Sequence, residues 1–151
     1  MDERRYYNKL TGDLGEEMVY NELCARGYAV EYDVPADLLV NGVPVEVKTA
    51  HVSNYRSERG DGYQFCIWRE GHCRVQAPVI VLVCLTDSGA TFFVVPSDSI
   101  GNRRKIVISH PEPEKYRGKW MCFLEKWDVI ATMVNAQSSY RPSLSLATSQ
   151  P

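Results

Sequence analysis

The dipeptide Asn41-Gly42 is the feature that most constrains how this chain folds, because it stands between two runs of β-branched and large apolar residues. Both central positions of a type I′ turn need positive φ, so Asn-Gly in this setting predicts a β-hairpin with a two-residue loop. That loop fixes the strand register and places Asp37 opposite Glu46. The pair falls at a non-hydrogen-bonded position, where side chains lie closest, and two like charges there destabilise a sheet.

Lys48 belongs to the same face of the hairpin as Glu46, because side chains along a strand repeat with period two. Two carboxylates and an ammonium group held together on one strand pair need compensation. A divalent cation supplies it most naturally, so the hairpin predicts a cation site.

Glu16 is a further candidate for this site. Residues 11–26 carry apolar side chains at three- and four-residue steps, which predicts a helix that Gly27 ends. Glu16 falls on the apolar face of that helix with Val19 and Leu23. A carboxylate there must be paired, protonated or bound to metal, although an acid in the first turn also favours the helix dipole.

Size and composition indicate an ordinary globular domain. The chain has 151 residues, of which 44% are hydrophobic and 24% are charged. We expect one domain, 1–136, and a flexible Ser- and Pro-rich tail, 137–151. No apolar run approaches the roughly 18 residues of a membrane span, so we expect a cytoplasmic or nucleoid-associated protein that is not secreted and has no membrane partner. A net charge of −2 neither attracts nor excludes nucleic acid.

The order of predicted elements favours an α/β fold, a mixed β-sheet flanked by helices. The first helix is followed by a strand at 28–32, the hairpin, and an exposed polar loop at 53–62. The remaining elements are strands at 63–68, 78–85, 90–95 and 105–109, a short helix at 96–100 with Ser97 as its cap, and a closing helix at 121–134. The strand at 78–85 is apolar throughout, which is typical of a central strand buried on both faces.

The five cysteines form no Cys-x-x-Cys pair. Cys66, His72 and Cys73 have poor spacing for a structural zinc site. Buried free thiols in a reducing compartment are the better interpretation.

Four short motifs follow one another along residues 12–68: Gly12-x-x-Gly15-Glu16, Leu23-x-x-x-Gly27-Tyr28, Ala36-Asp37 and Glu46-Val47-Lys48-Thr49. This order resembles the PD-(D/E)XK nuclease superfamily, and in style it is nearest to small homing endonucleases and Holliday junction resolvases. The resemblance implies a restriction-endonuclease-like core. Ala36 stands where that motif nominally has proline, although Pro35 precedes it, and no second domain supplies target recognition.

By this resemblance Asp37 and Glu46 are metal-binding carboxylates, Lys48 is the catalytic lysine and Glu16 is the helix acid. The predicted activity is a Mg²⁺-dependent DNA endonuclease, with Mn²⁺ as a substitute, in which a metal-activated water attacks the phosphodiester. The carbonyl of Val47 completes the ligand set. On the next strand, Gln64 is a candidate for positioning a phosphate or a water, as a glutamine does in some relatives.

The predicted partner is DNA, either duplex or branched, and Tyr55, Arg56 and Arg59 are the candidate contacts. A chain this small is expected to form a homodimer or homotetramer to cut both strands. One alternative is a catalytically silent nuclease fold that binds nucleic acid or serves as an assembly subunit. A metal-binding regulator using the cysteines is more remote.

Overall fold

The computed structural model describes residues 3–33, 36–52, 55–57, 60–67 and 77–137. Its helices and strands follow in the order α1 (Glu3–Ala25), β1 (Val30–Tyr32), β2 (Leu38–Val40), β3 (Val43–His51), β4 (Tyr55–Ser57), β5 (Gly60–Cys66), β6 (Val79–Thr86), β7 (Gly89–Pro96), η1 (Ser97–Ser99), β8 (Lys105–Ile108), η2 (Pro113–Lys115) and η3 (Lys119–Phe123). An α-helix at 128–137 follows.

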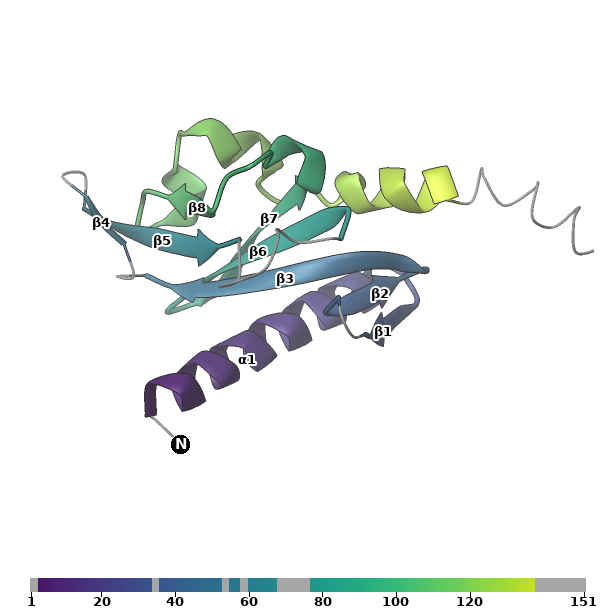
Figure 1. Ribbon diagram of the computed structural model, residues 1–151, viewed down its shortest axis with the longest axis horizontal. Coiled ribbons are helices and arrows are strands. Elements are labelled where there is room, and N and C mark those ends of the chain that lie inside the picture. Colours follow the sequence, from purple (N-terminus) through teal and green to yellow (C-terminus); the bar gives the residue numbers. More distant parts are fainter. Residues whose placement is uncertain (1–2, 34–35, 53–54, 58–59, 68–76, 138–151) are drawn as a thin grey trace, which may run out of the picture.

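Two sheets form the body of the fold. The larger has the strand order β1-β2-β3-β6-β7, with β3 and β6 parallel and the other neighbours antiparallel. The smaller is antiparallel, in the order β4-β5-β8. Figure 1 shows α1 along one side of β3 and the smaller sheet along the other. The predicted α/β class with a mixed sheet is therefore confirmed.

The larger sheet separates two hydrophobic cores. On one face, Val19 and Leu23 of α1 pack with Trp127 and Ile130 from the C-terminal part of the chain. On the other face, side chains of β5 and β8 cover the sheet together with Trp120. Strand β6 supplies side chains to both cores and is buried from Val79 to Leu85, so the prediction of a strand buried on both faces is confirmed.

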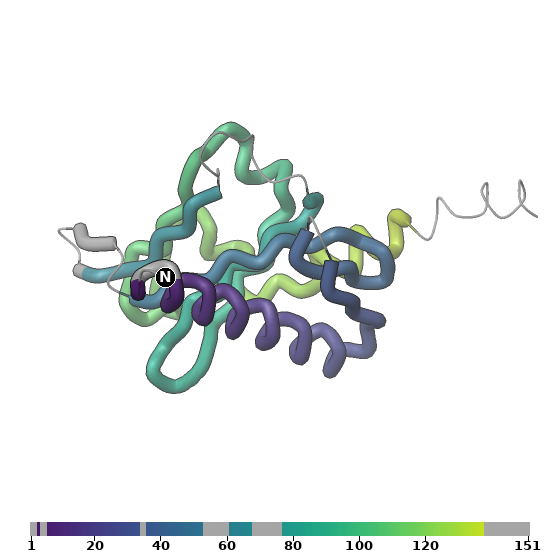
Figure 2. Tube along the Cα trace, turned by 60° about the horizontal axis from the view of Figure 1, so that its bottom comes forward, coloured from purple at the N-terminus to yellow at the C-terminus, as the bar shows by residue number. Residues whose placement is uncertain are grey.

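The Asn41-Gly42 hairpin is confirmed, with φ of 47° at Asn41 and 84° at Gly42. The register is the predicted one from Val40–Val43 to Leu38–Val45. Asn41 also ties the turn to β1, because its side chain accepts the backbone N–H of Ala29 at 2.8 Å and its own N–H donates to the Ala29 carbonyl at 2.8 Å. Figure 2 shows the hairpin curling beside the C-terminal end of α1.

Helix α1 is longer than predicted, because it begins at Glu3 rather than at residue 11. Its first turns bury no side chain in either core, so the core-facing pattern that located the helix covers only its second half. Gly27, with φ of 94°, follows the C-terminal end as predicted. No helix among the described residues is long and apolar enough to cross a membrane.

The predicted closing helix at 121–134 is confirmed only from residue 128 onward, and its first part is wrong. A 3-10 helix, η3, ends at Phe123, and the α-helix begins only at residue 128. Between them Leu124 forms a β-bridge with Phe93, and Glu125 adopts a φ of 50° while its N–H donates to the Phe92 carbonyl at 2.8 Å. Pairing with the edge strand β7 therefore interrupts the helix.

Two smaller predictions also fail. The segment 53–62 is not a loop throughout, since β4 and the start of β5 pair within it. Ser97 does not cap the short helix: Pro96 occupies the cap position, and the Ser97 hydroxyl donates to the carbonyl of Ala77.

Gly15 sets how closely α1 approaches β3. It is buried, and a Cβ atom at this position would overlap the hydroxyl of Thr49. Glycine at this position is therefore a packing requirement, whereas a Cβ on Gly12, one turn earlier, would meet nothing within 4 Å.

These two glycines allow a matched test. We expect Gly15→Ala to lower the free energy of unfolding by about 1–3 kcal/mol, because the helix must move off the strand. Gly12→Ala should raise it by about 0.5–1 kcal/mol, since alanine is the better helix former and space is open. Chemical denaturation of both variants and the wild type measures this, and equal effects would rule out the close contact.

Candidate functional site

Asp37 lies at the first residue before β2, where the chain bends. Its Oδ2 accepts the backbone N–H of Val47 at 2.7 Å. The predicted strand pair between Asp37 and Glu46 is therefore wrong: pairing stops at Leu38, and a carboxylate takes the place of the next backbone acceptor. This arrangement avoids two acids directly opposite each other.

Glu46 and Lys48 form an ion pair on β3, with 3.2 Å between Nζ of Lys48 and Oε1 of Glu46. Glu46 is 7% exposed and is the one buried charged residue among the described residues. Burial of a carboxylate needs a charged partner, and Lys48 supplies it. Val45 and Val47 of β3 face the core that α1 covers. Glu46 and Lys48 alternate with them along the strand, so both lie on the opposite face, the same face as each other, as predicted.

Glu16 approaches Asp37 from α1. Partial burial, a hydrogen bond to Asp37 and the negative charges of Asp37, Asp13 and Glu46 together raise the pKa of Glu16 to about 7. A carboxyl group can donate to a carboxylate only while it holds a proton, so Glu16 bonds Asp37 in its protonated form. The helix acid and the hairpin acids thus belong to one electrostatic cluster.

The cluster is suited in its chemistry to a hard divalent cation. Mg²⁺ binds one or two carboxylates and keeps several waters, and a cation beside Glu16 and Asp37 would take the place of the Glu16 proton. The described residues do not, however, contain three acids, histidines or cysteines already gathered as one coordinating group. Asp37 accepts the N–H of Val47, and Glu46 pairs with Lys48. The predicted metal ligands are therefore near one another, but their side chains would have to rearrange to coordinate one ion.

A stacked pair of aromatic rings stands beside Glu16, and sequence reasoning missed it. The rings of Tyr20 and Tyr32 are parallel within 5°, with centroids 4.8 Å apart, and Tyr32 is 60% exposed. Desolvation, followed by the charges of Glu17, Tyr20 and Glu16, raises the pKa of Tyr32. The sequence feature that could have indicated this pair is the position of Tyr32 at the end of the predicted strand 28–32, shortly before Asp37.

The other predicted site residues that the structure describes belong to the smaller sheet, whereas Glu46 and Lys48 are on β3 of the larger one. Gln64 alternates on β5 with Tyr63 and Phe65, which are buried in the core against the larger sheet, so its side chain belongs to the opposite face of that strand. Tyr55 and Arg56 are on β4, and Arg59 lies outside the described residues.

The cysteine prediction needs a correction. Cys24, Cys66 and Cys122 are free and exposed, and only Cys84 is a buried free thiol among the described cysteines. Cys66 ends β5, whereas its proposed partners His72 and Cys73 lie outside the described residues.

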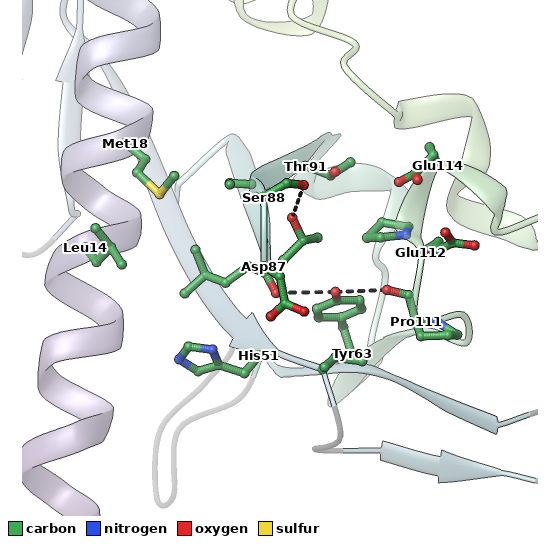
Figure 3. A pocket seen from close by; sticks show the side chains of 16 residues that line it. Leu14, Met18, His51, Tyr63, Asp87, Ser88, Thr91, Pro111, Glu112 and Glu114 are labelled. Atoms are coloured by element: carbon green, nitrogen blue, oxygen red, sulfur yellow. Dashed lines mark hydrogen bonds between the residues drawn. The ribbon is translucent and has the colours of Figure 1, made fainter.

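A cavity of about 930 Å³ opens near the far end of β3, between α1 and the β6–β7 turn. Leu14, His51 and Asp87 are among the residues that line it (Figure 3). The Tyr63 hydroxyl lies at its side, 3.3 Å from the Leu85 carbonyl and 3.1 Å from that of Pro111. None of the cluster acids lines this cavity, so it is separate from the candidate site.

No protein-family model matches the chain, and no curated protein sequence matches it. Among solved structures the chain is similar to a bacterial homing endonuclease, I-Ssp6803I, with a TM-score of 0.64 and 20% sequence identity. The likeness covers 87% of this chain and 98% of that protein. This likeness establishes a shared fold only. The chemistry of the site is argued from the residues of this chain.

The proton on Glu16 makes stability depend on pH. The pKa of Glu16 is about 7 in the folded protein against an ordinary 4.5, so its contribution to stability is fully present below about pH 4.5 and is lost as the pH rises through 7. In metal-free buffer we expect Glu16→Gln to leave the free energy of unfolding almost unchanged at about pH 4. At about pH 8 the substitution should raise the free energy of unfolding by about 1 kcal/mol, a value reduced for solvent screening.

Thermal and chemical denaturation across this pH range measure the effect, with Asp98→Asn, an exposed acid elsewhere, as the control. A constant difference between Glu16→Gln and wild type at all pH values would contradict the raised pKa of Glu16.

Proposed function

We propose that this chain is a metal-dependent endodeoxyribonuclease of the PD-(D/E)XK type. The observation that carries the proposal is the contact of Glu16 with Asp37 next to the buried Glu46–Lys48 pair. The fold shared with a bacterial homing endonuclease supports it. A protein that only binds DNA gains nothing from acids clustered where phosphates approach.

Mg²⁺ is the proposed cofactor, with Mn²⁺ as a substitute. A bound divalent cation supplies an activated water and neutralises charge on the phosphate oxygens. Asp37 and Glu46 would hold it, with the carbonyl of Val47, and Glu16 would bind a second ion or a metal-bound water. The N–H of Val47 fixes the Asp37 carboxylate in direction, which limits the rearrangement that binding requires.

Lys48 is the proposed catalytic lysine. The ion pair with Glu46 holds its ammonium group beside the acids. From there it can donate to the attacking water or to a phosphate oxygen and stabilise the charge that develops in the transition state. Loss of this group should therefore lower the rate of cleavage more than the affinity for DNA.

The proposed substrate is DNA, either duplex or a branched junction, and the fold shared with a homing endonuclease supports DNA as the partner. Tyr55, Arg56 and Arg59 are the proposed DNA contacts, and Gln64 remains a proposed positioning residue. Two or four copies would place sites on both strands of a two-fold symmetric target.

Cleavage assays test the activity directly. Purified protein is incubated with supercoiled plasmid and with four-way junctions, in Mg²⁺ or in EDTA. We expect cleavage in Mg²⁺ only, and a rate at least about a hundredfold lower for Lys48→Ala and Asp37→Ala, since each removes a charged group of the site. Lys126→Ala, an exposed lysine elsewhere, is the control and should cut like wild type.

Cleavage that survives both site variants would show that the catalytic site lies elsewhere. Tight DNA binding without cleavage of either substrate would favour the catalytically silent subunit.

Metal binding is also measurable without DNA. We expect millimolar Mg²⁺ to raise the Tm of the wild type, because a ligand that binds only the folded state stabilises it. Asp37→Ala should remove most of that rise. An equal rise in wild type and variant would place the metal away from Asp37.

A further inference from the structure

The N-terminal half of α1 carries apolar side chains that the rest of the chain does not cover. Five large hydrophobic side chains are exposed among the described residues, and four of them, Tyr6, Tyr7, Leu10 and Leu14, lie on this helix, each 46–64% exposed. The side chains of α1 that reach the core come from Met18 onward. Figure 1 shows the N-terminal turns diverging from β3.

These four side chains form one stripe, which we call the α1 stripe. At 100° per residue they fall within an arc of about 100°. The residues that pack on the sheet, Gly15, Val19 and Leu23, occupy the other side of the helix. The helix is therefore apolar on two sides, and only one is buried within the chain. The rings of Tyr6 and Tyr7 are in contact edge-to-face, with centroids 6.1 Å apart.

A line of charges borders the α1 stripe. Positions 5, 9, 13 and 17 follow one another at four-residue steps and lie on one side of it. They read Arg5, Lys9, Asp13 and Glu17, so the sign changes at the middle of the line. The side chains of the last three are exposed, and no salt bridge is formed by them within the described part of the chain.

We propose that the α1 stripe is the surface through which two copies of this chain pair, with their α1 helices antiparallel. A two-fold axis near residue 11 would place Lys9 of one copy opposite Asp13 of the other, and Arg5 opposite Glu17. The line of charges is complementary to itself in this orientation and repels itself in the parallel one. The inference does not depend on nuclease activity.

A second copy fits better than other occupants. Acids along the border of the stripe oppose DNA and anionic membrane surfaces. Four side chains left about half open expose on the order of 400 Å² on each copy, a patch of the size that marks interaction sites. That is about half of one partner's share of a standard interface, and the polar border of the helix supplies the rest.

The first test is the mass in solution of the full chain, by sedimentation equilibrium across a concentration series. We expect wild type to pass from one to two chain masses, or from two to four if a second interface exists. Leu10→Asp, at an exposed position, should raise the dissociation constant at least about tenfold, since it places a charge at the centre of the apolar contact. Asn21→Asp, exposed on the same line but beyond the stripe, should match wild type.

Circular dichroism and Tm of Leu10→Asp control for folding. A wild type that stays at one chain mass throughout the series, or a Leu10→Asp variant that associates as wild type does, would overturn the proposal.

Charge reversal tests the antiparallel orientation. Lys9→Glu and Asp13→Lys each put like charges opposite each other, so each variant alone should associate several-fold more weakly than wild type. A mixture of the two restores two opposite pairs in the mixed dimer, which native mass spectrometry should find in excess over either homodimer. If the substitutions acted only within each helix, homodimers and mixed dimers would form in statistical proportions. That result would refute the antiparallel pairing of the two helices.

Discussion

The close contact of α1 with β3 at Gly15 and Thr49 is the constraint on which the rest of the structure depends. Without a Cβ at Gly15 the helix lies against the strand, and the rotation that this contact fixes brings Val19 and Leu23 into the core. The next residue, Glu16, then lies at the side of the helix toward the hairpin, where it reaches Asp37. The same rotation turns Tyr6 and Leu10 away from the sheet. One contact thus sets the core, the candidate site and the exposed stripe.

The acids of the candidate site lower the stability of the folded protein in the absence of a cation. Glu46 is buried and needs Lys48, the pKa of Glu16 is raised to about 7, and the Asp37 carboxylate replaces a backbone acceptor next to β2. Acids this close to one another serve no purpose in packing, because apolar residues of similar size are often at least as stable. Local conflicts of this kind concentrate at functional sites, which is the physical basis for the proposed metal centre.

Local chemistry in the sequence predicted the parts of the fold that depend on it. Asn41-Gly42 fixed the hairpin register, Gly27 ended α1, and the apolar run in β6 marked a doubly buried strand. The parallel pairing of β3 with β6 and the separate β4-β5-β8 sheet join distant segments, which no local pattern encodes. The closing helix begins later than predicted because Leu124 and Glu125 pair with β7 instead. At the site, the hairpin pattern predicted that Asp37, Glu46 and Lys48 lie near one another. The bend of the chain at Asp37 and the position of Tyr32 beside Glu16 depend on tertiary contacts, so the sequence did not predict them.

Glu16, Asp37 and Glu46 are the proposed ligands of a divalent cation. Anomalous diffraction from crystals soaked in Mn²⁺ tests this proposal most directly, because the manganese signal locates the ion without reference to activity. We expect an anomalous peak within coordination distance of the carboxylates of Asp37 and Glu46, or of Asp37 and Glu16. A fully occupied peak elsewhere, with none beside Asp37, would contradict the proposal.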